Sequence, residues 1–273
     1  MKHLEALGDK WHALLPDPQK AMPGLVATVL SKGGTRDVWR TESESGESTL
    51  IVWPAEEPFR AGVLMHGPKG GELKPVTATP FMEGLPNLLT IEEAHPWFNQ
   101  REGEFAGTRG PGKAPLWFYN PLFERDAPQC AQGSTHNFEL SALAMALRPA
   151  LIDEMTISSG PQYEAYAAQW LEENPGKSRL DVPQLKFPLK GARILTPTDH
   201  CSTYQVRVPI TSVQTTLFGG VQVHMLHIQF GMNDPEPLDI MLYAPASICK
   251  DGYEPKDGDE IDIIMWLQGR IAD

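Results

Sequence analysis

Two histidines lie close together in the strand-like segment Val221–Phe230, at positions 224 and 227. Imidazole side chains can hold ligands, transfer protons and coordinate metals. Strict alternation along a strand would turn residues three positions apart to opposite faces. The apolar residues change phase at Met225–Leu226, which predicts one extra residue, a β-bulge, at that point. With such a bulge, His224 and His227 would share the outer face of the strand.

Polar side chains of the same strand and its expected neighbour complete this face. The candidate binding surface consists of Gln222, His224, His227, Gln229, Asp239 and Tyr243, with Met241 beside them and Gln205 and Arg207 further along. A ligand or partner site, a metal site, a solvated sheet face and a packing surface for the first domain are the alternatives for it. We predict no metal and no cofactor.

Two short motifs resemble known sites only in their letters. Gly107–Lys113 matches the G-x-x-x-x-G-K of a phosphate-binding loop, but Ala114 stands where the hydroxyl residue is needed, and no apolar strand precedes it. A surface loop is the better interpretation. Glu92 and His95 form an E-x-x-H motif, yet His95 precedes a proline, a position biased away from helix. An acidic loop is favoured over a metal site there.

Familiar catalytic patterns are missing from the sequence. There is no G-x-S-x-G, H-E-x-x-H or S-x-x-K motif. Cys201 directly follows His200, and adjacent residues rarely bring a thiol and its base within reach. The acidic group Asp251, Asp257, Asp259 and Asp262 indicates a surface loop, with weak Ca²⁺ binding as the lesser alternative. Catalytic residues therefore stay unassigned.

The front half is expected to be rich in β-structure. Residues 1–22 are assigned to an N-terminal docking helix, because leucines and a tryptophan form one helical stripe over residues 3–15. Residues 23–155 are assigned to a β-rich domain with short strands, the first of them at Leu25–Leu30. No internal repeat is visible.

A helix and a connector are expected over residues 156–200. Ser159 and Gln162 fit a capping box, and Asn174 starts a helix-ending Asn-Pro-Gly. Between them lies an apolar stripe at helical spacing, made of Tyr163, Tyr166, Ala167, Trp170 and Leu171.

The last part, residues 201–273, alternates polar and apolar residues over five strand-like segments, with a hairpin turn at Gly219-Gly220. This pattern is typical of a small barrel of the oligonucleotide/oligosaccharide-binding (OB) class. We therefore predict a mainly β, α+β protein: a β-rich N-terminal domain, a helical connector and a C-terminal small OB-like β-barrel.

A resemblance supports this fold. The ending Tyr253-Glu-Pro-Lys-Asp-Gly-Asp-Glu-Ile, followed by Trp266-Leu-Gln-Gly-Arg270, resembles the closing strand of OB-fold proteins. Together with Trp117-Phe-Tyr-Asn-Pro and Asn137-Phe-Glu-Leu-Ser-Ala-Leu-Ala, it also resembles a family of uncharacterised bacterial proteins. The resemblance implies a fold and no activity.

The net charge and the cysteine content indicate which partners and which compartment to expect. The net charge is −12, from 35 acidic against 23 basic residues, and nucleic acid attracts the opposite balance. Three cysteines, odd in number and far apart, indicate reduced thiols in a cytoplasmic protein, and no apolar run suits a membrane span. The leading hypothesis is a non-catalytic cytoplasmic protein that binds a protein or small molecule. An enzyme of unrecognised type, with its site in a cleft between domains, and a single-strand nucleic-acid binder are the alternatives.

Overall fold

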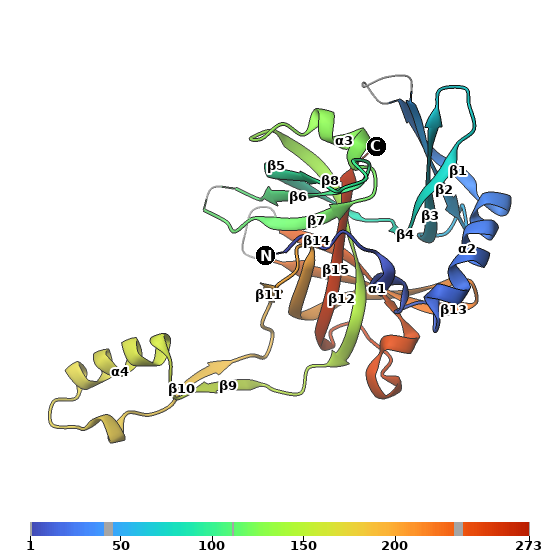
Figure 1. Cartoon of the computed structure of the whole chain (residues 1–273). Helices are drawn as coiled ribbons and strands as arrows, with labels where there is room; N and C mark the ends of the chain where they lie inside the picture. Colours follow the sequence, from blue (N-terminus) through green and yellow to red (C-terminus); the bar gives the residue numbers. More distant parts are fainter. Residues whose placement is uncertain (1, 41–45, 111, 232–236, 273) are drawn as a thin grey trace. The chain divides into compact units, whose positions relative to one another are not determined.

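The computed structural model describes residues 2–40, 46–110, 112–231 and 237–272 (Figure 1). Strands hold 51% of the residues and helices 19%, which confirms the predicted mainly β, α+β class. The chain forms two compact units. One contains Met1–Pro149 and Arg193–Asp273, and the other is Ala150–Ala192.

The larger unit begins with two helices and a four-stranded antiparallel sheet. The helices are α1 (Gly8–Trp11) and α2 (Pro18–Lys32). The sheet has the order β1 (Gly34–Arg40), β2 (Gly46–Trp53), β3 (Phe59–Pro68) and β4 (Lys74–Met82). Trp11 and Val29 of the helices are buried in one cluster with Phe59 of β3, so this cluster holds helices and sheet together.

Two expectations for the N-terminus were wrong. In place of the docking helix predicted within residues 1–22, the structure has the four-residue helix α1 and, from Pro18, the start of the separate helix α2. The segment Leu25–Leu30, predicted as a strand, lies inside α2. Asp17 starts this helix because its side chain accepts a hydrogen bond from the Lys20 amide at 3.3 Å, and Pro18 occupies the first helical position, where its missing N–H costs nothing.

A nine-stranded sheet makes up the rest of the larger unit. Its members, in the order of their pairing, are β11 (Ile194–Pro197), β12 (Thr203–Phe218), β13 (Val221–Phe230), β14 (Leu238–Pro245), β8 (Thr135–Pro149), β15 (Glu260–Ile271), β7 (Leu116–Asn120), β6 (Gly103–Thr108) and β5 (Leu85–Pro96). The short helices α3 (Phe123–Asp126) and η1 (Ala127–Gln129) precede β8, and η3 (Ala246–Ile248) and η4 (Lys250–Gly252) precede β15.

Two further pairings close this sheet into two rings of five strands. β12 pairs with β15, so β12, β13, β14, β8 and β15 form a C-terminal ring. β5 pairs with β8, so β5, β6, β7, β15 and β8 form an N-terminal ring. The rings share the β8–β15 ladder, and a single hydrophobic cluster includes Phe118 and Phe138 of one ring and Leu226 and Ile228 of the other.

The rings repeat one topology, although the sequence shows no repeat. In each, a three-stranded antiparallel meander is followed by short helical turns and a long strand that pairs with the first strand. The last meander strand of each ring then runs parallel to the closing strand of the other ring. Matching ion pairs stand at the two ends of the shared ladder, Arg148–Asp262 and Arg270–Glu139.

The predicted boundaries divide this arrangement differently. Residues 201–273 do not close a barrel alone, because Met241–Tyr243 of β14 pairs with Ser141–Leu143 of β8 from the front half. Backbone groups at a strand edge need hydrogen-bond partners, and β8 supplies them for β14 and β15. Residues 23–155 likewise divide between the four-stranded sheet and the N-terminal ring.

The smaller unit, Ala150–Ala192, contains the helix that the sequence predicted. It pairs β9 (Glu154–Ile157) with β10 (Leu185–Pro188) and carries α4 (Pro161–Glu173) and the short helix η2 (Arg179–Asp181). The predicted apolar stripe of α4 forms its hydrophobic cluster. The predicted capping box is wrong, because Gly160 is the N-cap residue and no side chain caps the helix.

Candidate functional site

The strand β13 runs without the predicted bulge. Its register with β14 is continuous from Val223 to Phe230, and its register with β12 shifts only between Ile210 and Ser212, where the extra residue belongs to β12. Strict alternation therefore holds, and His224 and His227 point to opposite faces. The shared face predicted for the two imidazoles does not form.

Three of the predicted residues do meet. His227 Nε2 lies 2.7 Å from Asp239 Oδ1, and Gln229 Nε2 donates to the same oxygen at 3.0 Å. Asn87 of β5 joins β14 here, because its side-chain amide donates to the Asp239 carbonyl at 2.7 Å and its oxygen accepts from the Asp239 amide at 2.9 Å. The side-chain contacts join β13 to β14 within the C-terminal ring, and the two Asn87 contacts join this ring to β5.

The other three residues are separated from this cluster. Tyr243 lies on the same face but is fully buried against Phe59, and its hydroxyl donates to the Glu83 carbonyl at 2.9 Å. His224 is 5% exposed on the opposite face, and its burial lowers its pKa. Gln222 is exposed near the end of β13, on the side of His224. The six predicted residues therefore do not share one face, and the chain's own N-terminal part covers Tyr243.

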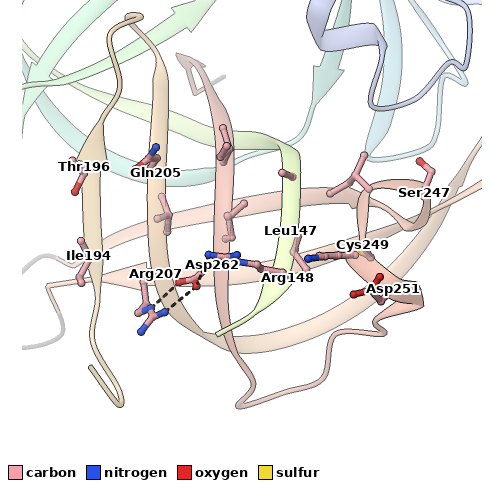
Figure 2. Close-up of a pocket in the computed structure, with 16 residues that line it drawn as sticks. Leu147, Arg148, Ile194, Thr196, Gln205, Arg207, Ser247, Cys249, Asp251 and Asp262 are labelled. Atoms are coloured by element: carbon pink, nitrogen blue, oxygen red, sulfur yellow. Dashed lines mark hydrogen bonds and ion pairs between the residues drawn. The ribbon is translucent and has the colours of Figure 1, made fainter. Parts of the chain in front are cut away.

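A larger site lies on the outside of the C-terminal ring. A cavity of about 860 Å³ extends over β11, β12, β15, β8 and the turns η3 and η4 (Figure 2). We call it the outer groove. Its lining residues are Ala146, Leu147, Arg148, Ile194, Thr196, Gln205, Val206, Arg207, Ser247, Ile248, Cys249, Lys250, Asp251, Asp262, Ile263 and Ile264. Its volume falls in the range of small-molecule sites.

Strand register arranges the floor of the outer groove in two rows. Thr196, Gln205 and Ile264 stand side by side in one row on successive strands. The second row continues from Ile194 to Arg207, Asp262 and Arg148 (Figure 2). These residues alternate with the ring interior, where Val206 and Ile263 belong to the hydrophobic cluster. The floor of the groove thus carries the apolar side chains of Ile194 and Ile264 among polar and charged ones.

The charged row is a network of one carboxylate and two guanidinium groups. Arg207 donates to both oxygens of Asp262, at 2.7 and 2.9 Å, and Arg148 lies 3.6 Å from the same carboxylate. The Arg207 side chain is 9% exposed, and that of Arg148 is 55% exposed. With Lys250 and Asp251, the groove has three cationic and two anionic side chains. It is therefore locally cationic in a protein of net charge −12.

Cys249 is the one thiol of the outer groove. It is buried, and desolvation raises its pKa to about 11. A thiol needs a depressed pKa to act as a nucleophile at neutral pH, and the sixteen lining residues include no histidine that could serve as its base.

The other sequence motifs lie on strands or accept hydrogen bonds from the backbone. Gly107 and Thr108 end the strand β6, so the segment expected as a surface loop begins on a strand; β6 is antiparallel to the following strand β7, and Pro111 between them lies outside the described residues. Asp257 and Asp259 accept backbone hydrogen bonds from Val213 and Lys256. The E-x-x-H motif lies on the strand β5, so the acidic loop expected there was wrong.

A second group of donor atoms lies on the N-terminal ring. The ligand atoms of His3, Glu104 and Cys201 are all within 4.8 Å of one another. Sequence spacing could not find them, since about a hundred residues separate each from the next.

Two residues of the outer groove were predicted to lie elsewhere: Arg207 beside the candidate binding surface of β13, and Asp262 in an acidic surface loop. The charged Asp262 within the apolar run of the last strand was the available signal.

Comparisons with known proteins add no relative to this geometry. No protein-family model, curated protein or solved structure matches the chain. Among the described residues, no helix combines the length and the apolar character that a membrane crossing requires.

Proposed function

We propose that this chain is a non-catalytic binding protein and that the outer groove holds its ligand. The observation that carries the proposal is a groove of about 860 Å³ that combines the exposed apolar side chains of Ile194 and Ile264 with the guanidinium groups of Arg148 and Arg207. Pockets for small molecules combine apolar lining with a few placed polar groups. The ligand that fits is a small molecule with an apolar body and an anionic group.

Arg148 is the expected anchor for the anion. Its guanidinium is half exposed and lies beside Asp262, whose carboxylate is already held by the buried Arg207. A carboxylate or sulfonate can therefore approach Arg148 without displacing the Arg207–Asp262 pair. Ile194 and Ile264, each 40% exposed, would cover the apolar body. Burying such side chains contributes about 25 cal/mol per Å² of apolar surface.

We also propose that the C-terminal ring is an OB-like barrel and that the protein is cytoplasmic. The five-stranded C-terminal ring supports the barrel, with the qualification that β8 of the front half completes it. All three cysteines are free and buried, which supports a reducing compartment.

The two alternatives have less support. Nucleophilic catalysis by the one thiol of the outer groove would need a depressed pKa, and burial raises the pKa of Cys249 to about 11. Single-strand nucleic acid needs exposed aromatic platforms. Among the described residues, Phe98, at 93%, is the one exposed aromatic side chain of the large hydrophobic type, and it lies outside the groove.

Anilinonaphthalene sulfonate, an apolar anionic dye that fluoresces on binding, tests the proposal. We expect saturable binding to the folded protein, lost in Ile264→Glu and weakened about three- to tenfold in Arg148→Gln. Leu217→Glu, which places the same charge on an exposed apolar site outside the groove, is the matched control and should bind as the wild type does.

Near-ultraviolet circular dichroism must show native packing in every variant, since the dye also binds loosely packed states. Unchanged binding by a folded Ile264→Glu variant would place the dye elsewhere and refute the assignment of the groove. An equal loss in Leu217→Glu would do the same.

A further inference from the structure

Three chemically different donors converge at one place on the N-terminal ring, away from the outer groove. His3 belongs to the N-terminal segment, Glu104 to β6, and Cys201 to the turn before β12. Their ligand atoms lie within 4.8 Å of one another, and His3 Nδ1 is 2.6 Å from Glu104 Oε2.

Backbone contacts bring these segments together independently of the three side chains. The Lys2 amide donates to the Asp199 carbonyl at 2.7 Å, and the Cys201 amide donates to the Lys2 carbonyl at 2.9 Å. A parallel bridge joins Lys2 with His200. The N-terminal segment is thus aligned beside the turn before β12, which places His3 next to Cys201.

Neighbouring side chains orient the donors. The Ser202 hydroxyl donates to Glu104 Oε1 at 2.6 Å, which leaves Oε2 directed at His3. The His3 ring stacks on His95 with centroids 3.6 Å apart and meets Trp117 edge-on at 4.9 Å. Outer contacts of this kind hold metal ligands in position and are part of what tunes a metal site.

Burial and charge favour a cation among these donors. Glu104 is 2% exposed and Cys201 5%. A buried carboxylate needs compensation, and one divalent ion balances a carboxylate and a thiolate, with neutral imidazole as the third ligand. The combination of nitrogen, oxygen and sulfur donors is that of zinc, whereas Mg²⁺ and Ca²⁺ take oxygen ligands.

We propose that His3, Glu104 and Cys201 bind one Zn²⁺ ion, with water at the fourth position. Bond lengths of about 2.0–2.3 Å place tetrahedral donors roughly 3.5 Å apart, so small side-chain rotations close the present spacing. On binding, the Cys201 thiol releases its proton to solvent. The proton of the hydrogen bond between His3 Nδ1 and Glu104 Oε2 passes through solvent to His3 Nε2, so that a neutral imidazole and a carboxylate each form a bond to the metal. The His3 side chain is 25% exposed, which leaves an entry path.

Cobalt provides the test, because Co²⁺ replaces Zn²⁺ in such sites and a thiolate ligand gives it a near-ultraviolet charge-transfer band. The full-length protein is treated with a chelator and titrated with Co²⁺ at neutral pH. We expect the band to saturate at one equivalent and Zn²⁺ to displace it. Cys201→Ser should abolish the band, whereas Cys249→Ser, which alters another buried free thiol, should keep it.

A second variant separates metal binding from a purely structural role. His3 and Glu104 could simply form an ion pair that fastens the N-terminal segment. His3→Gln lies on a part-exposed side chain and should fold; we expect its Co²⁺ affinity to fall at least tenfold. Zn²⁺ should raise the melting temperature of the wild type and not of His3→Gln. A wild-type protein without the charge-transfer band, or a band that persists in Cys201→Ser, would overturn the proposal.

Discussion

Removing the carboxylate at the centre of the outer groove should destabilise the fold measurably. Asp262 accepts two hydrogen bonds from Arg207, at 2.7 and 2.9 Å. The Arg207 side chain is 9% exposed and that of Asp262 is 22% exposed. Asp262→Asn keeps the shape of the side chain but removes the negative charge that faces the buried guanidinium of Arg207.

The magnitude follows from this burial. Losing one partner of a fully buried ion pair costs about 3–5 kcal/mol, while exposed pairs contribute about 0–1 kcal/mol. Because Asp262 retains some contact with solvent, we expect Asp262→Asn to lower the free energy of unfolding by about 2 kcal/mol. Arg148→Gln, which removes the half-exposed partner at 3.6 Å, should cost about 0.5 kcal/mol or less.

Urea unfolding followed by tryptophan fluorescence measures both values, with the slope compared to confirm that the unfolded state is unchanged. High salt should alter the Arg148→Gln difference and leave most of the Asp262→Asn difference, since buried pairs are screened less. Equal costs for the two variants would show that burial of the ion pair does not set its contribution to stability.

Three further outcomes are expected. Gly269→Ala should destabilise the shared ladder by about 2 kcal/mol or more, because the added Cβ would lie 2.7 Å from a side-chain atom of Leu140, whereas Gly8→Ala meets open space and should be near neutral in the same urea assay. Replacing residues 150–192 by an eight-residue Gly-Ser linker should preserve the larger unit's circular dichroism spectrum. The linker would join the end of β8 to the start of β11, and these strands are three strand spacings, roughly 14 Å, apart. Stability should fall as the pH drops below about 6.5, because buried His224 has a lowered pKa and the unfolded state takes up the proton; His224→Gln should reduce this fall in acid titrations.

Local patterns in the sequence predicted the elements whose apolar residues follow one period. The stripe of α4 and the alternation of β13 and β14 gave their types correctly. α2 was missed because Pro23 and Gly24 break a helical pattern and the run after them is rich in β-branched residues. The N-cap at Asp17 and the proline after it were the stronger signal.

Long-range pairing could not be read from local patterns. The C-terminal ring depends on β8, which lies about a hundred residues before β14 and pairs with it in parallel. The topological repeat is also not visible in the sequence, because the two rings have the same strand order but different side chains. The ion pairs Arg148–Asp262 and Arg270–Glu139 are its traces, and they become meaningful only once the register of the ladder is known.

The candidate sites were missed for a related reason. The predicted bulge assigned the phase change to β13, whereas the irregularity lies in β12, and this single misplacement put His224 on the wrong face. A one-residue shift in a strand exchanges its two faces. The donors at positions 3, 104 and 201 share no strand or helix, so only the folded chain brings them together.

Isoleucine methyl NMR tests the assignment of the outer groove most directly. The wild-type protein, labelled at its isoleucine methyl groups, is titrated with benzoate, a small apolar anion. We expect the signals of Ile194, Ile248 and Ile264, which line the groove, to shift together and saturate, while those of Ile51 and Ile91 stay in place. Shifts confined to isoleucines outside the groove, or none at millimolar benzoate, would contradict it.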